Sequence, residues 1–135
     1  MPLPLLDTNI FLRHLIGEPE NQAHRATSYF EKIEQGKQKA ITTHAVMFEI
    51  VFTLERFYKK NKDEVTNLIL PLLTLPAIKI EGKQSLRKIF TIYVEKNISF
   101  IDAYHAVFME KEGIHEVVSF DRDFDRIKDI IRSEP

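Results

Sequence analysis

The chain has 135 residues, of which 44% are hydrophobic and 29% are charged, and its formal net charge at pH 7 is −1. This length and composition are typical of a globular domain with one core, and they exclude a disordered chain. The near-neutral charge means that any binding to nucleic acid depends on a local basic patch. The chain contains no cysteine, which excludes disulfides, thiol nucleophiles and cysteine-based zinc sites.

The expected organisation is a single domain spanning residues 1–135. The N-terminus has no basic segment followed by a long apolar run, and no apolar run reaches the roughly 18 residues of a membrane span. We therefore expect a cytoplasmic protein that does not associate with a membrane.

Short apolar runs alternate along the chain with segments of helical periodicity. In the N-terminal half we expect a buried strand at residues 3–6, a short helix ended by Gly17, a helix capped by Asn21 and ended by Gly36, a strand at 39–42, a long helix from Thr43 to about Lys60, and a helix opened by Asn61 or Asp63. In the C-terminal half we expect a strand at 77–80, a helix from Leu86 to near Asn97, a helix from Ser99 to Gly113, a strand at 116–119, and a short helix at 124–131 with or without a last strand. This alternation predicts a three-layer α/β/α sandwich around a short, mainly parallel sheet.

Asp7 ends the first apolar run, in the sequence Leu6-Asp7-Thr8-Asn9. It therefore lies at the carboxyl end of a predicted strand, which is where open α/β sheets bind their ligands. The alternative is that one of these polar residues caps the helix that follows.

Glu49 lies in a helical segment, residues 44–54, that is otherwise almost entirely apolar. A lone ionised carboxylate on such a face is costly unless a cation or a hydrogen-bonding partner compensates it. The alternative is a side chain at the rim of the apolar stripe that reaches solvent or pairs with a lysine.

Two further aspartates lie at element boundaries nearer the C-terminus. Asp102 follows Ser99 by three residues, which suits either a capping-box carboxylate or a ligand projected from the first turn of a helix. Asp121 follows a predicted strand, and its alternative role is an Asx turn or helix cap. Asp123 and Asp125 compete with Asp121 for either role.

These four carboxylates, Asp7, Glu49, Asp102 and Asp121, could converge at one edge of a parallel sheet. Clustered carboxylates repel one another, so at least one of them would be protonated without a cation. Mg²⁺ and Mn²⁺ resolve this conflict because they prefer carboxylate oxygens and retained waters, and such ions commonly serve phosphate chemistry. The pattern therefore favours an acidic Mg²⁺ or Mn²⁺ site.

Over essentially its whole length the chain resembles the PIN-domain nucleases, and most closely the VapC-type toxins of toxin–antitoxin pairs. The motifs that carry this resemblance are Leu6-Asp7-Thr8-Asn9, the lone Glu49, Asp102 at the start of a late helix, and Ser119-Phe120-Asp121-Arg122-Asp123-Phe124. The last motif more often begins with Thr in the family, so Ser119 is a departure that keeps the hydroxyl.

The resemblance implies a divalent-metal-dependent endoribonuclease that hydrolyses RNA phosphodiester bonds with Mg²⁺ or Mn²⁺ and needs no protein nucleophile. It assigns metal-binding and catalytic roles to four acids and supporting roles to two polar residues: Asp7, Glu49, Asp102, Asp121, Asn9 and Ser119. It also implies a homodimer that is restrained by a cognate antitoxin protein. Arg13 and Arg122 could neutralise substrate phosphate; the alternative, which the sequence favours for each one taken alone, is a solvated helix residue.

Other interpretations of the same residues are open. Asp102 and His105 have the spacing of a transition-metal ligand pair on a helix, but di-iron bundles need two such pairs. An aspartyl-nucleophile phosphatase of the haloacid dehalogenase type would carry a second aspartate where this chain has Asn9. An RNA-processing nuclease outside toxin–antitoxin systems would use the same acids. A non-catalytic module could instead bind RNA or protein through aromatic residues whose alternative role is core packing, namely Tyr29, Phe52, Phe57 and Tyr58.

Overall fold

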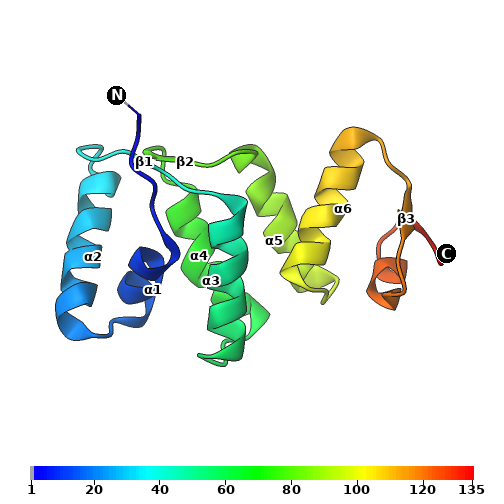
Figure 1. The fold of residues 1–135 in the computed structure, drawn as a ribbon, viewed down its shortest axis with the longest axis horizontal. Helices are drawn as coiled ribbons and strands as arrows, with labels where there is room; N and C mark the ends of the chain where they lie inside the picture. The colour runs from blue at the N-terminus through cyan, green and yellow to red at the C-terminus, as the bar shows by residue number, and fades with distance from the viewer. Residues whose placement is uncertain (1) are drawn as a thin grey trace. The chain divides into compact units, whose positions relative to one another are not determined.

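The computed structural model describes residues 2–135, which form six α-helices, two 3-10 helices and four short strands (Figure 1). The chain falls into two compact units, one that extends through Lys83 and one that spans Gln84–Pro135. Within the described residues, no helix has the length and apolar character needed to cross a membrane.

The first unit contains four α-helices and strand segments that all pair in parallel. Its elements are α1 (Thr8–Ile16), α2 (Glu20–Glu34), β1 (Ala40–Ile41), α3 (His44–Arg56), α4 (Lys62–Leu73) and β2 (Ile78–Lys79), and η1 (Lys83–Ser85) follows at the division between the units. β1 pairs with β2, and Leu5 adds a single parallel bridge to Ile41. β1 therefore lies between β2 and the apolar run that precedes Asp7.

Local hydrogen bonds fix the helix ends where the sequence predicts them. Gly17 ends α1 with φ at 84°, a left-handed conformation that glycine adopts without strain, and its N–H donates to the Arg13 carbonyl at 2.9 Å. At the start of α3, Thr43 Oγ1 accepts the Val46 N–H at 3.3 Å. A reciprocal capping box opens α4 at Asn61.

Two helix boundaries in this unit differ from the prediction. α2 begins directly after Pro19, so Asn21 lies inside its first turn and is not its cap. Proline suits this position because its ring already holds φ near the helical value. α3 ends at Arg56 rather than near Lys60, because the chain turns back and the Lys60 N–H donates to the carbonyl of Leu54 at 2.9 Å.

The apolar run before Asp7 pairs less extensively than the predicted buried strand. Leu6 is 3% exposed and donates its N–H to the Ile41 carbonyl at 2.8 Å, whereas Leu5 is 60% exposed. Thr42 Oγ1 donates to the Leu6 carbonyl at 3.0 Å, which ties the end of the run to the end of β1. The run therefore buries one face only, and Asp7 leaves it beside the carboxyl end of β1.

The aromatic residues at the end of α3 lie at the surface of the first unit. Phe52 is 59% exposed and Phe57 is 74% exposed, so core packing, the alternative role considered for them, is wrong for these two residues. The Arg56 guanidinium lies 5.5 Å from the centroid of the Phe52 ring, and Phe57 contacts Tyr58 edge-on with centroids 4.9 Å apart. The end of α3 therefore presents an aromatic surface.

The second unit consists of α5 (Leu86–Glu95), α6 (Phe100–Glu112), β3 (Glu116–Val118), η2 (Arg122–Arg126) and β4 (Ile131–Ser133). α5 and α6 lie side by side (Figure 1). The Phe100 ring packs between them, with its centroid 4.8 Å from that of Phe90 and 5.6 Å from that of Tyr93. β3 pairs in parallel with β4.

The predicted helix at residues 124–131 is wrong. The structure has the short 3-10 helix η2 at Arg122–Arg126, and β4 follows it. Phe124 is the one buried side chain in η2, so the segment has no continuous apolar face with which a longer helix could pack. Each strand pair in the described residues is parallel, and the α/β class with short parallel strands is confirmed.

Candidate metal centre

Three aspartates of the second unit form an acidic cluster. One carboxylate oxygen from each of Asp102, Asp121 and Asp123 lies within 4.8 Å of the other two. Asp102 projects from the first turn of α6, whereas Asp121 immediately precedes η2 and Asp123 lies in it. The N-terminus of α6 and the loop after β3 therefore meet at the carboxyl end of that strand.

Serine hydroxyls and one carboxylate hold the backbone of this acidic cluster. The Asp102 N–H donates to Ser99 Oγ at 3.1 Å, which caps α6. The Asp121 N–H donates to Ser119 Oγ at 2.9 Å, and Asp121 Oδ1 accepts the Asp123 N–H at 2.9 Å. Ser119 therefore contacts the backbone that carries two of the three acids.

The electrostatics of the acidic cluster disfavour full ionisation. Burial raises the pKa of Asp102 above its ordinary value, and the neighbouring Asp121 carboxylate raises it further. A hydrogen bond with Ser99 and the charge of His105 act in the opposite direction without reversing the shift. Burial first, and the neighbouring carboxylate second, therefore disfavour the ionised form of Asp102.

The size and donor chemistry of the acidic cluster fit a hard divalent cation. Mg²⁺ binds oxygen ligands at about 2.1 Å, so two oxygens on one ion lie at most about 4.2 Å apart. The three oxygens, which lie within 4.8 Å of one another, need only small side-chain rotations to share an ion. His105 is exposed and does not belong to the acidic cluster. An all-oxygen site for Mg²⁺ or Mn²⁺ therefore fits the structure better than a transition-metal site formed by Asp102 and His105.

The structure also distinguishes the two aspartates that competed with Asp121 in the sequence. Asp125 Oδ1 accepts a hydrogen bond from Arg132 Nε at 3.0 Å, so an arginine already neutralises it. Asp123 lies in the acidic cluster, and its Oδ1 is 3.6 Å from Arg126 Nη2 in a looser ion pair. Asp123, and not Asp125, is therefore positioned beside Asp102 and Asp121.

Arg132 in β4 contacts the loop that carries Asp121, and the sequence did not predict this. Besides its bond to Asp125, its Nη1 donates to the Ser119 carbonyl at 3.0 Å and to Glu134 Oε2 at 2.7 Å. These contacts tie the loop to the last strand. The sequence signal that could have found Arg132 is a basic residue in the middle of a short terminal strand, directly after Ile130 and Ile131.

Asp7 and Glu49 belong to the first unit, and both are exposed. Asp7 occupies the N-cap position of α1, yet its side chain makes no capping hydrogen bond. Glu49 is exposed on α3, away from the residues that this helix buries, so the predicted penalty for a carboxylate on an apolar face does not arise. Both carboxylates are therefore open to a ligand.

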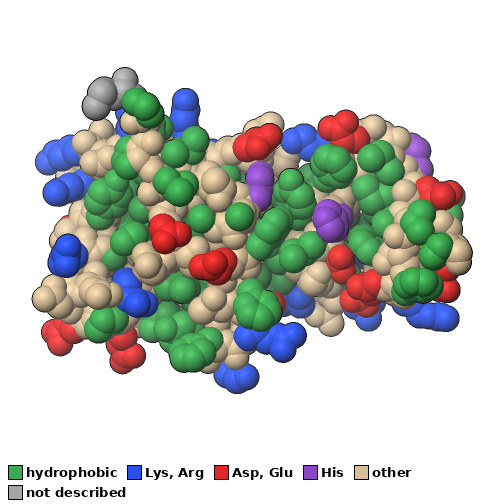
Figure 2. All heavy atoms as spheres, viewed as in Figure 1, with side chains coloured by type: hydrophobic (Ala, Val, Ile, Leu, Met, Phe, Trp, Pro, Cys, Tyr) green, Lys and Arg blue, Asp and Glu red, His purple; other side chains and the backbone are tan. Residues whose placement is uncertain are grey.

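The remaining predicted residues are all accessible. Asn9 is exposed in the first turn of α1, Arg13 is half-buried one turn later, and Arg122 is exposed at the start of η2. On the face drawn in Figure 2, acidic and basic side chains both occur, and the net charge of the chain is −1. Electrostatic attraction of a polyanion would therefore depend on individual arginines and lysines.

Comparisons with known proteins agree with this site chemistry. The sequence model of the PIN domain family matches residues 5–130. The chain is 30% identical over 125 residues to a VapC ribonuclease of Aquifex aeolicus (strain VF5), and the alignment covers 93% of this chain and 92% of that protein. The chain therefore belongs to the PIN domain family.

Proposed function

We propose that this protein is a metal-dependent endoribonuclease that hydrolyses phosphodiester bonds of RNA. Membership of the PIN domain family and the similarity to a VapC ribonuclease support this activity. The observation that carries the proposal is the acidic cluster, in which three carboxylate oxygens lie within 4.8 Å of one another. Such a cluster suits the hard cations that serve phosphate hydrolysis.

The proposed metal-binding and catalytic acids are Asp7 and Glu49 from the first unit and Asp102, Asp121 and Asp123 from the second. A Mg²⁺ or Mn²⁺ ion held by such carboxylates supplies an activated water and stabilises the leaving oxygen. Water would be the attacking group, so no protein nucleophile is required, and the chain's own residues position the acids and the substrate.

Two polar residues and two arginines complete the proposed site. Ser119 holds the backbone amide of Asp121 at 2.9 Å, and Asn9 stands in the first turn of α1 as the corresponding support. Arg13 and Arg122 pair with substrate phosphates, because guanidinium groups bind phosphate oxygens with two donors at once and offset the repulsion from the acids.

We also propose that residues 1–135 act as one domain, because a single family match runs from residue 5 to residue 130 across the division at Lys83. We further propose that the protein acts in the cytoplasm, where it would meet RNA substrates.

The proposed biological role is the toxin of a toxin–antitoxin pair, acting as a homodimer under the control of an antitoxin protein. Two observations support a protein partner. The chain is similar to a VapC ribonuclease over 93% of its length, and the exposed rings of Phe52 and Phe57 form an apolar surface of the kind that partners cover. An RNA-processing nuclease would use the same acids but would form no stable complex with the product of a neighbouring antitoxin gene.

The proposed activity predicts that purified protein cleaves single-stranded RNA with Mg²⁺ or Mn²⁺ and stops when EDTA removes the metal. Gel analysis of end-labelled RNA measures cleavage, and re-addition of either ion should restore it. Cleavage that persists in metal-free protein would contradict the metal's role. If a broad set of RNAs stays intact with both ions, the chain is a non-catalytic binding module instead.

Asp102→Asn is expected to raise the melting temperature of the metal-free protein by a few degrees and to remove most of the rise that Mg²⁺ or Mn²⁺ produces. The substitution relieves repulsion with Asp121 but deletes a metal ligand, and it keeps the N–H that bonds to Ser99. Thermal melting with EDTA or with added metal measures both effects. Glu112→Gln removes the same charge from the exposed end of α6 and should keep the full response to metal. If Asp102→Asn responds to metal as the wild type does, Asp102 is not a ligand.

A further inference from the structure

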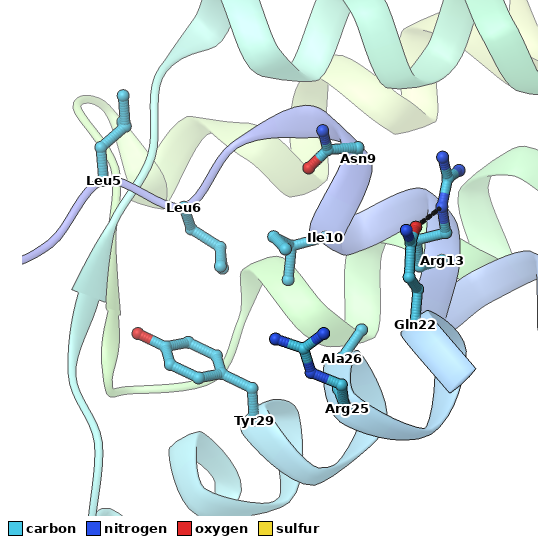
Figure 3. A pocket seen from close by; sticks show the side chains of 9 residues that line it. All are labelled: Leu5, Leu6, Asn9, Ile10, Arg13, Gln22, Arg25, Ala26 and Tyr29. Carbon is cyan, nitrogen blue, oxygen red and sulfur yellow. Dashed lines mark hydrogen bonds between the residues drawn. The ribbon is translucent and has the colours of Figure 1, made fainter. Parts of the chain in front are cut away.

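A cavity of about 660 Å³ opens between α1 and α2 in the first unit (Figure 3). Four apolar residues contribute to its lining: Leu5, Leu6, Ile10 and Ala26. The guanidinium groups of Arg13 and Arg25 and the ring of Tyr29 complete the wall from the two helices. This volume falls within the roughly 300–1,000 Å³ typical of pockets for small organic ligands.

Contacts between α1 and α2 hold this cavity in shape. Two hydrogen-bonding pairs join the helices: Arg13 Nε donates to Gln22 Oε1 at 2.7 Å, and His14 Nδ1 lies 2.8 Å from Thr27 Oγ1. The Phe30 ring packs against Phe11 and His14, with centroids 5.3 Å and 4.7 Å apart. The first of these hydrogen bonds also orients the Arg13 guanidinium, whose Nη atoms bond to no other described residue. The two helices that frame the cavity are therefore fixed relative to one another, and a ligand would not have to bring them together.

The cavity begins beside the proposed catalytic residues. Asn9, two positions after Asp7, contributes to its lining. In Figure 3 the Asn9 amide lies at the start of α1, and Arg25 and Tyr29 extend from α2 on the other side of Ile10. A nucleotide in the cavity would therefore be a near neighbour, along the RNA chain, of a phosphate held at Asp7.

We propose that this cavity is a nucleotide subsite for the RNA substrate. In it, an unpaired base next to the scissile phosphate packs between Ile10 and the ring of Tyr29, and the phosphate of that nucleotide pairs with Arg25. The subsite rests on the proposed ribonuclease function and deepens it, because it makes the enzyme sensitive to the nucleotide beside the cleaved bond.

The mixed character of the lining matches a nucleotide. The flat face of a base can pack against the aliphatic and aromatic walls, and its polar edge can form hydrogen bonds with the amides of Asn9 and Gln22. The phosphate attached to the nucleotide can pair with the two arginines. An apolar protein segment would fill the floor but would leave the charges of Arg13 and Arg25 without a counterpart. Charge complementarity therefore favours RNA.

The test measures the binding of a short fluorescent single-stranded RNA to the Asp7→Asn protein, which keeps the RNA intact, at several salt concentrations. Arg25→Gln in this background is expected to weaken binding about tenfold and to lower the salt dependence of log Kd by about 0.7, the loss of one phosphate contact. Tyr29→Ala is expected to weaken binding by a similar factor without changing the salt dependence, because it removes stacking.

Two matched variants serve as controls. Tyr29→Phe keeps the ring and should bind RNA as the parent does. Lys32→Gln makes the same change in charge on an exposed position of α2 that does not line the cavity, and it should leave the affinity and the salt dependence unchanged. In the otherwise wild-type enzyme, Tyr29→Ala should also change the preferred cleavage positions on a long RNA, whereas Tyr29→Phe should not.

The outcomes separate this subsite from the activity itself. If Arg25→Gln and Tyr29→Ala both bind RNA with the parent's affinity while the wild type cleaves RNA, the subsite is wrong and the ribonuclease function stands. If both variants keep RNA binding but no longer bind a co-expressed antitoxin, the cavity binds a protein partner, and this result also overturns the subsite. If the wild type cleaves no RNA with either metal, the proposed function fails, and the subsite fails with it.

Discussion

Asp7→Asn is expected to slow metal-dependent RNA cleavage about a thousandfold and to leave the protein folded. A loss of this size corresponds to about 4 kcal/mol of transition-state stabilisation, comparable with the removal of one strong electrostatic contact at a reacting phosphate. The stability should be unaffected because Asp7 is exposed and its carboxylate makes no capping bond to α1. Asparagine is as good an N-cap residue as aspartate, so the helix start keeps a favourable residue.

Initial cleavage rates at saturating Mg²⁺ or Mn²⁺ measure the first effect, and thermal melting in EDTA measures the second. Asp63→Asn is the matched control, because Asp63 is an exposed aspartate in the first turn of α4 in the same unit. It should cleave RNA at the wild-type rate. Undiminished cleavage by Asp7→Asn would remove Asp7 from the mechanism, and a large fall in its melting temperature would assign the carboxylate a structural role.

Most helix ends were predictable because capping is local, although the start of α2 and the end of α3 were not. A cap requires only a suitable side chain that accepts a hydrogen bond from the backbone N–H three residues later, as at Thr43, Asn61 and Ser99. A left-handed residue at a helix end favours glycine for steric reasons alone, as at Gly17 and Gly113. These signals lie within single turns of the chain, so the sequence predicts them without knowledge of the tertiary structure.

The sequence did not predict in the same way which residues of a helix are exposed to solvent. α3 is apolar around most of its circumference, so periodicity does not decide whether Glu49 or its neighbours face the core. In the structure Glu49 is exposed and Phe52 is 59% exposed on the same helix. The choice depends on what packs against α3, which is information from elsewhere in the chain.

The acidic cluster contains one feature that the sequence predicts and one that depends on the tertiary structure. The convergence of Asp102 and Asp121 follows from a helix N-terminus and a strand end meeting at one place, and the sequence predicts it. The exclusion of Asp125 depends on Arg132, which bonds to Asp125 from β4. A pairing between a loop and a later strand has no local signature, so the sequence left this choice open.

Phe100→Ala is expected to lower the free energy of unfolding by about 3–5 kcal/mol, a large part of the roughly 5–15 kcal/mol available to a domain. Phe100 is 4% exposed, and its ring packs on Phe90 and Tyr93 between α5 and α6. Alanine would leave a cavity where these rings meet. Urea unfolding followed by circular dichroism measures the change, with the slope of the transition as a check on two-state behaviour.

Phe108→Ala is the matched control, because it makes the same substitution in the same helix at a residue that is 47% exposed. It should lower the unfolding free energy by no more than about 1 kcal/mol, since far fewer packing contacts are lost. Equal effects at the two positions would contradict the packing described here. Asp102 lies two residues after Phe100, in the same first turn of α6. Phe100→Ala should therefore also weaken the rise in melting temperature that Mn²⁺ produces, whereas Phe108→Ala should preserve it. The packing of α6 against α5 thus fixes the position of a proposed metal ligand, and the two variants connect the stability of the second unit to its chemistry.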